Sequence, residues 1–114
     1  MVKKKYVPAR GDIVWLNFNP QSGHEQKGKR PAVVISPKEY NKKTGLALFC
    51  PITSKIKNYP FEARIENEKI NGVVLSDQIK CLDWKTREIE FIAKASPEKT
   101  GEIINKISVL LFVP

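Results

Sequence analysis

The sequence is poor in the residues from which most catalytic and metal sites are built. It contains one histidine, His24, so no two histidines can act together as general acid and general base, as they do in many ribonucleases. The two cysteines, Cys50 and Cys81, do not combine with His24 at the spacing of zinc ligands. We therefore expect neither a metal site nor a cofactor. The acidic residues considered for a carboxylate metal centre are scattered along the chain: Asp12, Glu25, Asp77 and Asp83.

Long apolar runs and glycine-rich motifs are also missing. No apolar run approaches the roughly 20 residues that span a bilayer, and the basic N-terminus MVKKKYVPARGD lacks the apolar core of a signal peptide. Both cysteines lie in apolar stretches, so we expect them to be buried and reduced in a cytoplasmic protein. Neither a glycine-rich phosphate loop nor a nucleophilic serine elbow occurs. Chemistry on an anion would therefore have to use arginine, hydroxyl groups and at most one carboxylate.

Positive charge is what the sequence has in excess. The 114 residues include 20 basic and 12 acidic ones, which gives a formal net charge of +8. This excess predicts an anionic partner, such as nucleic acid, an acidic membrane surface or an acidic protein. The length and the 41% hydrophobic content fit one compact domain over residues 1–114. The lysines at positions 3–5 are expected to form a solvated tail, with an auxiliary RNA contact as the alternative.

Short apolar segments separated by turn signals predict a mainly β domain of the α+β class. Residues 61–66 alternate between apolar and charged side chains, which is typical of a half-buried strand. Asn71-Gly72 is a turn signal that precedes the next strand. So many short strands favour a small, strongly curved sheet or barrel. The predicted strands are 13–18, 32–35, 46–53, 61–66, 73–75, 79–84 and 89–93.

Two helices are predicted from start and stop signals. With Ser36 as N-cap and Glu39 completing a capping box, a short helix should run to Gly45. Ser96-Pro97 repeats the start signature before a second helix, whose apolar residues recur at helical spacing. A barrel of this size need not bury that whole stripe, and a homodimer would. The stripe consists of Ile103, Ile104, Ile107, Leu110 and Leu111.

The segment HEQKGKRPAVVIS, residues 24–36, raises the question of function. Seven polar, charged or glycine residues lead into Pro31, which fits the start of a strand, and then into buried-looking residues. The loop 19–30 is long for a small domain, and such loops usually act as lids or binding loops. Two interpretations stand here: a solvated linker, or an anion-binding site held by a rigid edge, with Arg30 anchored at the root of the strand.

Seven short motifs occur in a fixed order over essentially the whole chain. They are Gly11-Asp12-Ile13-Val14-Trp15; Glu25-Gln26-x-Gly28-x-Arg30-Pro31-Ala32-Val33-Val34-Ile35-Ser36; Tyr40-Asn41; Pro51-Ile52-Thr53-Ser54; Tyr59-Pro60-Phe61; Gly72-Val73-Val74-Leu75-x-Asp77-Gln78; and the closing apolar helix. None is specific alone, but the set resembles the MazF/PemK family of bacterial toxins, sequence-specific endoribonucleases paired with an antitoxin. The resemblance implies an SH3-like small β-barrel of the MazF/PemK/CcdB type with a C-terminal helix. It also implies a homodimer and metal-independent cleavage of single-stranded mRNA, which inhibits translation and growth.

The resemblance further implies which residues are catalytic. Arg30 and Thr53 occupy the positions of the family's catalytic pair, and the ribose 2′-OH attacks the adjacent phosphate to leave 2′,3′-cyclic phosphate and 5′-OH ends. A guanidinium matches two phosphorane oxygens at once, and a threonine hydroxyl can donate to a phosphoryl oxygen. Arginine is a poor proton acceptor. Glu25 is the candidate base, although the nearby Lys27 should keep its basicity modest, and the identity of the base stays open.

Further residues are candidates for RNA binding, each with an ordinary alternative. His24 is a loop residue that can stack on a base. Asp77 and Gln78 either contact base edges in an unpaired strand or cap a turn. Four lysines are predicted to form a phosphate-tracking groove, although each alone would be a solvated charge. They are Lys27, Lys29, Lys55 and Lys57.

The catalytic residues also have structural alternatives. Arg30 can instead form a salt bridge at the barrel rim, with Asp77 or Glu25 as its partner. Thr53 can be an ordinary strand residue, as threonine often is, and Glu25 a solvated loop acid. Both tryptophans are expected in the core rather than as stacking platforms for bases.

Two competing functions remain from other classes. Relatives with the same fold poison DNA gyrase without catalysis, and they rely on a tryptophan close to the C-terminus. This chain ends LLFVP and retains Arg30 and Thr53, which argues against that function. A binding-only nucleic-acid module is the other alternative, and a turnover test separates it from an enzyme. In the toxin interpretation, an acidic antitoxin segment should cover the basic groove, and its affinity should fall as salt rises.

Overall fold

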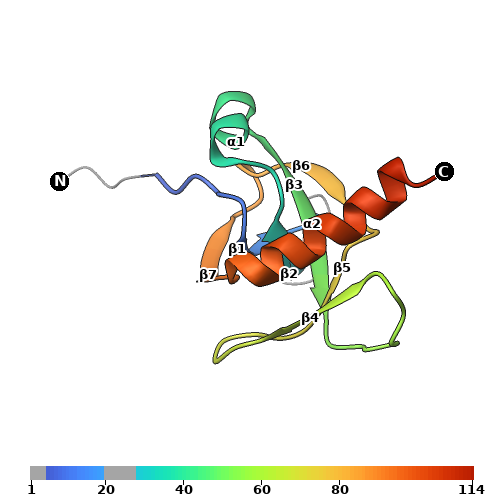
Figure 1. The fold of residues 1–114 in the computed structure, drawn as a ribbon. Coiled ribbons are helices and arrows are strands. Elements are labelled where there is room, and N and C mark those ends of the chain that lie inside the picture. The colour runs from blue at the N-terminus through green and yellow to red at the C-terminus, as the bar shows by residue number, and fades with distance from the viewer. Residues whose placement is uncertain (1–4, 20–27) are drawn as a thin grey trace.

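The structure is a computed structural model and describes residues 5–19 and 28–114. Seven strands and two helices lie in these residues (Figure 1). In chain order they are β1 (Asp12–Asn17), β2 (Lys29–Val34), α1 (Lys38–Thr44), β3 (Leu46–Thr53), β4 (Glu62–Glu66), β5 (Asn71–Leu75), β6 (Lys80–Asp83), β7 (Glu90–Lys94) and α2 (Pro97–Phe112). No helix in this described part is long and apolar enough to cross a membrane.

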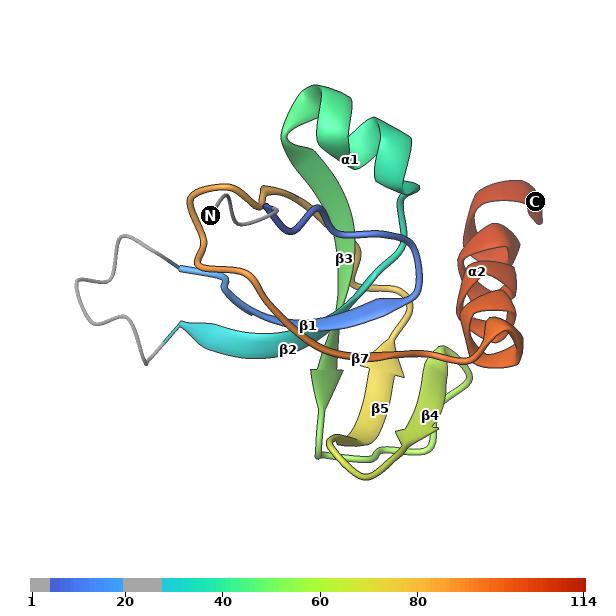
Figure 2. The same ribbon diagram turned by 90° about the vertical axis from the view of Figure 1, so that its left-hand side faces the viewer.

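Strand β3 is the spine of a curled antiparallel sheet. It pairs with β2 on one edge, and β1 and β7 follow beyond β2. On the other edge, β6 pairs with the first half of β3 and β5 with its last two residues. Because the partner changes along β3, the sheet bends, and Figure 2 shows α1 and the β4–β5 hairpin at opposite ends of this strand. This small barrel-like sheet with a C-terminal helix confirms the predicted mainly β fold.

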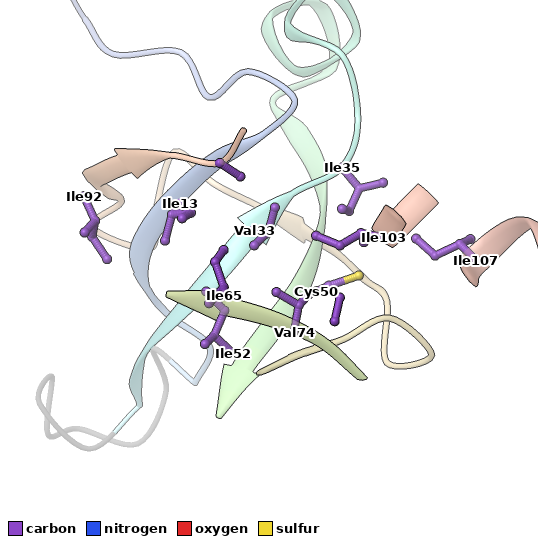
Figure 3. Close-up of a cluster of buried hydrophobic side chains, with 12 residues drawn as sticks. Ile13, Val33, Ile35, Cys50, Ile52, Ile65, Val74, Ile92, Ile103 and Ile107 are labelled. Atoms are coloured by element: carbon purple, nitrogen blue, oxygen red, sulfur yellow. The ribbon is translucent and has the colours of Figure 1, made fainter. Parts of the chain in front are cut away.

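Both faces of the sheet are buried, which explains why its strands are so densely apolar. On one face, α2 covers a cluster that includes Ile13 and Val33, and Ile103 and Ile107 point from the helix toward the strands (Figure 3). Neighbouring residues of the same strands point the opposite way, as alternation along a strand requires. They form a second cluster of Val14, Leu16, Ala32, Val34, Ala47, Phe49 and Trp84.

The predicted capping of α1 is wrong, although its end is as predicted. The helix starts after Pro37, which is its N-cap residue, and no side chain caps it. Ser36 instead donates its hydroxyl to Oδ1 of the buried Asn41 at 2.5 Å, so no capping box with Glu39 forms. A buried amide must find partners, and here it takes the hydroxyl that would have capped the helix. Gly45 ends α1 in the left-handed conformation, with φ 73°.

The turn between β4 and β5 also differs from the prediction. Asn71 and Gly72 do not form it, because both lie inside β5. The chain reverses earlier, at Asn67, whose Oδ1 accepts the backbone N–H groups of Lys69 and Ile70 at 2.8 and 2.9 Å. Asparagine closes turns in this way with its own side chain. The Asn-Gly signal thus belongs to a strand, where the glycine has another purpose described below.

The two cysteines have different environments, so the prediction that both are buried is half wrong. Cys50 is a core residue of β3, and burial together with the negative charge of Asp77 raises the pKa of its thiol to about 12. Cys81 is exposed on β6, a short strand that pairs with β3. The first two residues of this four-residue strand, Lys80 and Cys81, are both exposed.

Helix α2 begins as the sequence predicts and ends partly uncovered. Ser96 is the N-cap, and its side chain accepts the N–H of Lys99 at 3.1 Å. Ile107 is the last buried residue of the helix. Beyond it the apolar stripe emerges from the fold, with Leu111 68% and Phe112 81% exposed. The expectation that one copy of the domain leaves part of this stripe uncovered is confirmed.

Candidate active site

A cleft of about 490 Å³ opens where β2 and β3 separate. The two strands pair as far as Ala32 and Pro51 and then diverge. Pro31 and Pro51 have no backbone N–H to donate, so they suit the point at which a ladder ends. The lining residues come from β2, β3, the segment after β3, the first residue of β4, and β5 with the residues on either side of it. They are Arg30, Pro31, Pro51, Ile52, Thr53, Ser54, Lys55, Lys57, Tyr59, Glu62, Ile70, Asn71, Leu75 and Gln78.

Arg30 lies inside β2 rather than before it. The strand begins at Lys29, three residues earlier than predicted, and Arg30 lies opposite the buried Leu16 of β1. Its side chain is exposed there, beyond the buried part of β2, and lines the cleft. Among the described residues, none forms a hydrogen bond or an ion pair with it. The predicted alternative of a salt bridge to Asp77 is therefore absent, whereas Glu25 lies outside the described residues.

Thr53 ends β3, as predicted, and lines the same cleft. Its Oγ1 accepts the backbone N–H of Lys55 at 3.2 Å, which leaves the hydroxyl proton free to be donated to a ligand. Its carbonyl oxygen is covered closely by β5. A Cβ added to Gly72 would lie 2.4 Å from that oxygen, so only glycine permits this approach of β5 to β3.

The segment after β3 is held by a carboxylate. Glu62 accepts the backbone N–H groups of Lys57 and Asn58, both at 2.9 Å. Asn58 takes the left-handed conformation, with φ 58°, so this segment has one defined shape. Lys55 and Lys57 line the cleft, as the predicted phosphate-binding groove requires. The alternating sequence pattern of β4 does not indicate that Glu62 binds these two backbone N–H groups.

Tyr59 and Asp77 form a second fixed contact beside the cleft. The tyrosine hydroxyl donates to Oδ1 of Asp77 at 2.7 Å. This hydrogen bond, with smaller contributions from burial and from the negative charges of Asp77 and Glu62, raises the pKa of Tyr59 to about 12. The hydroxyl therefore stays protonated and its donor is occupied. Gln78 lines the cleft directly, whereas Asp77 stands behind Tyr59.

The remaining predicted site residues are elsewhere. Lys29 does not line the cleft, and its Nζ lies 3.8 Å from the carboxylate of Glu90 on β7. His24, Glu25 and Lys27 lie outside the described residues. Trp84 is buried in the second core cluster, and Trp15 is partly buried against the cluster that α2 covers. Both tryptophans were expected in the core. Within residues 5–19 and 28–114, no three histidine, cysteine or acidic side chains gather closely enough to hold a metal ion.

The chain is similar in sequence to known endoribonuclease toxins. The chain is 44% identical over 107 residues to the endoribonuclease toxin MazF of Escherichia coli K12, which covers 94% of this chain and 96% of that protein. It is 34% identical to the endoribonuclease toxin ChpB of the same strain, over 97% of this chain and 99% of that one.

The fold of this chain is similar to that of solved MazF structures. MazF of Deinococcus radiodurans superposes with a TM-score of 0.83 at 48% identity, covering 94% of this chain and 98% of that one. The MazE–MazF complex from the same organism gives a TM-score of 0.85 at 41% identity, over 96% and 100%. Residues 9–111 match the family described as the PemK-like, MazF-like toxin of type II toxin–antitoxin systems. A match over this span, together with identities above 40%, means that the chain belongs to the family of PemK-like, MazF-like toxins.

Proposed function

We propose that the protein is the toxin of a toxin–antitoxin pair and cleaves single-stranded mRNA as a sequence-specific endoribonuclease. The observation that carries this proposal is that Arg30 and Thr53 line one cleft. The relatives named as endoribonucleases cover nearly the whole chain, which supports the same activity here. Cleaving mRNA removes the templates of translation and arrests growth, in the cytoplasm where mRNA is translated. We further propose that the whole chain acts as one toxin domain.

In the proposed reaction, the 2′-oxygen of the ribose forms a bond to the adjacent phosphorus and the bond to the 5′-oxygen breaks. The guanidinium of Arg30 binds two non-bridging oxygens as charge accumulates on them, and the hydroxyl of Thr53 donates to one of these oxygens. The 2′-OH proton passes to a base, and the leaving 5′-oxygen takes a proton from water to become the 5′-OH. The products are a 2′,3′-cyclic phosphate and a 5′-OH end.

Glu25 is the base that we propose. Glu62 is the only carboxylate among the described residues that line the cleft. It is unsuited to the role because each of its oxygens accepts a backbone N–H. Arg30 already supplies the positive charge that the phosphorane needs, so we propose that the reaction proceeds without a metal ion.

Substrate binding extends along the same cleft. Lys55 and Lys57 are placed to neutralise the phosphates beside the cut, and two such contacts account for a measurable salt dependence. The ring of Tyr59 offers a surface on which a base can stack, and the amide of Gln78 can both donate to and accept from a base edge. His24, Lys27 and Lys29 are proposed as further contacts from the loop side.

The experiment that tests this function uses a long single-stranded RNA and excess EDTA. We expect the purified protein to cut at discrete sites, and the new ends to be 5′-hydroxyls and 2′,3′-cyclic phosphates. Kinase labelling without prior phosphatase treatment detects the first, and acid hydrolysis opens the second to a 2′- or 3′-phosphate on the same end. Cutting only after Mg²⁺ is restored, or ends with a 5′-phosphate, would contradict the metal-free mechanism.

Two protein partners belong to the proposal. One is an acidic antitoxin segment lying over the basic cleft, which the complex of the MazE and MazF proteins of Deinococcus radiodurans supports by analogy. As expected from the sequence, the affinity of the antitoxin segment should fall as the salt concentration rises. The other is a second copy of the chain, because the last turn of α2 and the residue after it leave an apolar surface uncovered. That surface consists of Val109, Leu110, Leu111, Phe112 and Val113.

A charge placed on this surface should dissociate the homodimer. We expect the wild type to sediment at about twice its 13.0 kDa chain mass and Leu111→Glu to sediment as a monomer, because a desolvated carboxylate in an apolar interface costs several kcal/mol. Asn105→Glu adds the same charge to an exposed residue earlier in the helix and should remain dimeric. A dimer that survives Leu111→Glu would show that the two copies meet through another surface.

A further inference from the structure

A second cleft lies at the far end of β3 from the proposed active site. Its volume is about 820 Å³. α1 precedes the first residue of β3, whereas Thr53 is the last, and an eight-residue strand is roughly 23 Å long. Figure 2 shows α1 and the β4–β5 hairpin at these two ends. The lining residues are Lys5, Tyr6, Val7, Lys38, Lys42, Trp84 and Lys85.

The three walls of this cleft are tied together by one buried residue. Asn41 on α1 is fully buried, and its Nδ2 donates to the carbonyl of Pro8 at 2.8 Å. Its backbone carbonyl accepts the indole N–H of Trp84 at 3.0 Å. The N-terminal segment, α1 and the turn after β6 are therefore held in fixed positions relative to one another. Tyr6 is anchored as well, because its hydroxyl donates to the carboxylate of Asp12.

The charge of this cleft is all of one sign. Four of its seven lining residues are lysines, contributed by three separate elements, and no acidic residue lines it. None of the four ammonium groups forms a hydrogen bond or an ion pair with another described residue. Asp83 is close in sequence to Lys85, but its carboxylate accepts the backbone N–H of Lys85 and the hydroxyl of Thr86 instead. The cleft is thus a concentration of unneutralised positive charge, which an anionic chain would relieve.

We propose that this cleft binds the phosphate backbone of the RNA substrate at a distance from the cut, as a second contact for the same strand. This inference rests on the proposed endoribonuclease function. Lysines are point charges that suit phosphates, and the aromatic surface of Tyr6 beside them suits unpaired bases better than acidic side chains. Engaging both clefts raises the affinity for long RNA without altering the reaction, because the second contact becomes intramolecular. A short oligonucleotide held in the active-site cleft does not reach it.

The test is a binding measurement on Lys38→Gln/Lys42→Gln/Lys85→Gln. The probe is a fully 2′-O-methylated single strand of about 30 nucleotides, which lacks the attacking hydroxyl and exceeds the roughly 4–16 nucleotides that one small domain contacts. Each phosphate contact contributes about 0.7 to the slope of log K against log salt for single strands, so losing three should make the slope less steep by about 2. A strand of about five nucleotides containing a mapped cut site should bind both proteins equally.

Matched single variants protect the test against misfolding. Lys42→Gln should reduce the slope by about 0.7, whereas Lys43→Gln, the neighbouring residue of α1 that does not line the cleft, should leave it unchanged. Equal slopes for the triple variant and the wild type would overturn the proposal. Weaker binding of poly-L-glutamate with unchanged RNA binding would also overturn it and assign the cleft to an acidic polypeptide.

The two proposals can fail separately. If the wild type cuts unmethylated RNA but the triple variant binds long RNA like the wild type, the second cleft is refuted and the endoribonuclease stands. If the wild type cuts no RNA but the slopes differ as expected, the cleft binds RNA and the proposed catalysis is wrong.

Discussion

Replacing Arg30 with alanine is expected to lower the rate of RNA cleavage by at least 10²–10³-fold, roughly the cost of removing one preorganised donor from a developing oxyanion. Arg30 lies in β2 and lines the cleft together with Thr53, so its guanidinium can reach a phosphate bound there. Thermal stability should not change, because the side chain is exposed and bonds to no other described residue. The measurements are single-turnover cleavage and a melting curve on the same preparation.

Arg30→Lys is the matched variant for this prediction. It keeps the positive charge but loses the planar fork that holds two phosphoryl oxygens at once, so we expect a rate between those of the wild type and Arg30→Ala. If lysine restores full activity, Arg30 acts as a point charge alone. If alanine itself cuts at the wild-type rate, the reaction is stabilised by another group and the proposed role of Arg30 is wrong.

The second large effect is expected from Gly72→Ala. A Cβ at this position would lie 2.4 Å from the carbonyl oxygen of Thr53 and 3.1 Å from its carbonyl carbon. Both are backbone atoms, so β5 must move away from β3 at the residue that we place in the active site. Overpacking of this kind costs about 1–3 kcal/mol. We also expect a drop in cleavage rate, because the hydroxyl of Thr53 moves with its backbone.

Gly101→Ala is the control, because a Cβ there meets nothing within 4 Å and the residue is exposed in α2. Alanine in a helix is more favourable than glycine by up to about 1 kcal/mol, so this variant should be stabilised and fully active. Urea denaturation of both variants gives the comparison. A Gly72→Ala protein as stable and active as the wild type would mean that the two strands tolerate separation.

Strong local patterns made part of the fold predictable. β3 agrees with its predicted bounds, and α2 starts at the predicted cap, because burial and capping there depend on adjacent residues. The errors arose where a distant partner decided the outcome. Ser36 serves Asn41 rather than the helix end, and Gly72 is a glycine because β3 passes close to it, not because the chain turns.

The candidate site was predictable only through its resemblance to a family. No local rule brings Arg30 and Thr53 together, since their meeting depends on the separation of β2 from β3. Glu62 and Tyr59 were missed as parts of the site for a related reason: one holds backbone N–H groups and the other bonds to Asp77, and both contacts are made only after folding. The second cleft has no sequence signal at all, because three separate segments build it.

The unequal cysteines give the protein a natural attachment point for a reporter dye. The thiol of Cys50 is buried and its pKa is raised to about 12, so almost none of it is thiolate at neutral pH. Cys81 is exposed on β6, along the half of β3 nearer to the second cleft. A maleimide fluorophore should therefore label Cys81 alone, without any engineered substitution, and report on RNA as it arrives at either end of the sheet.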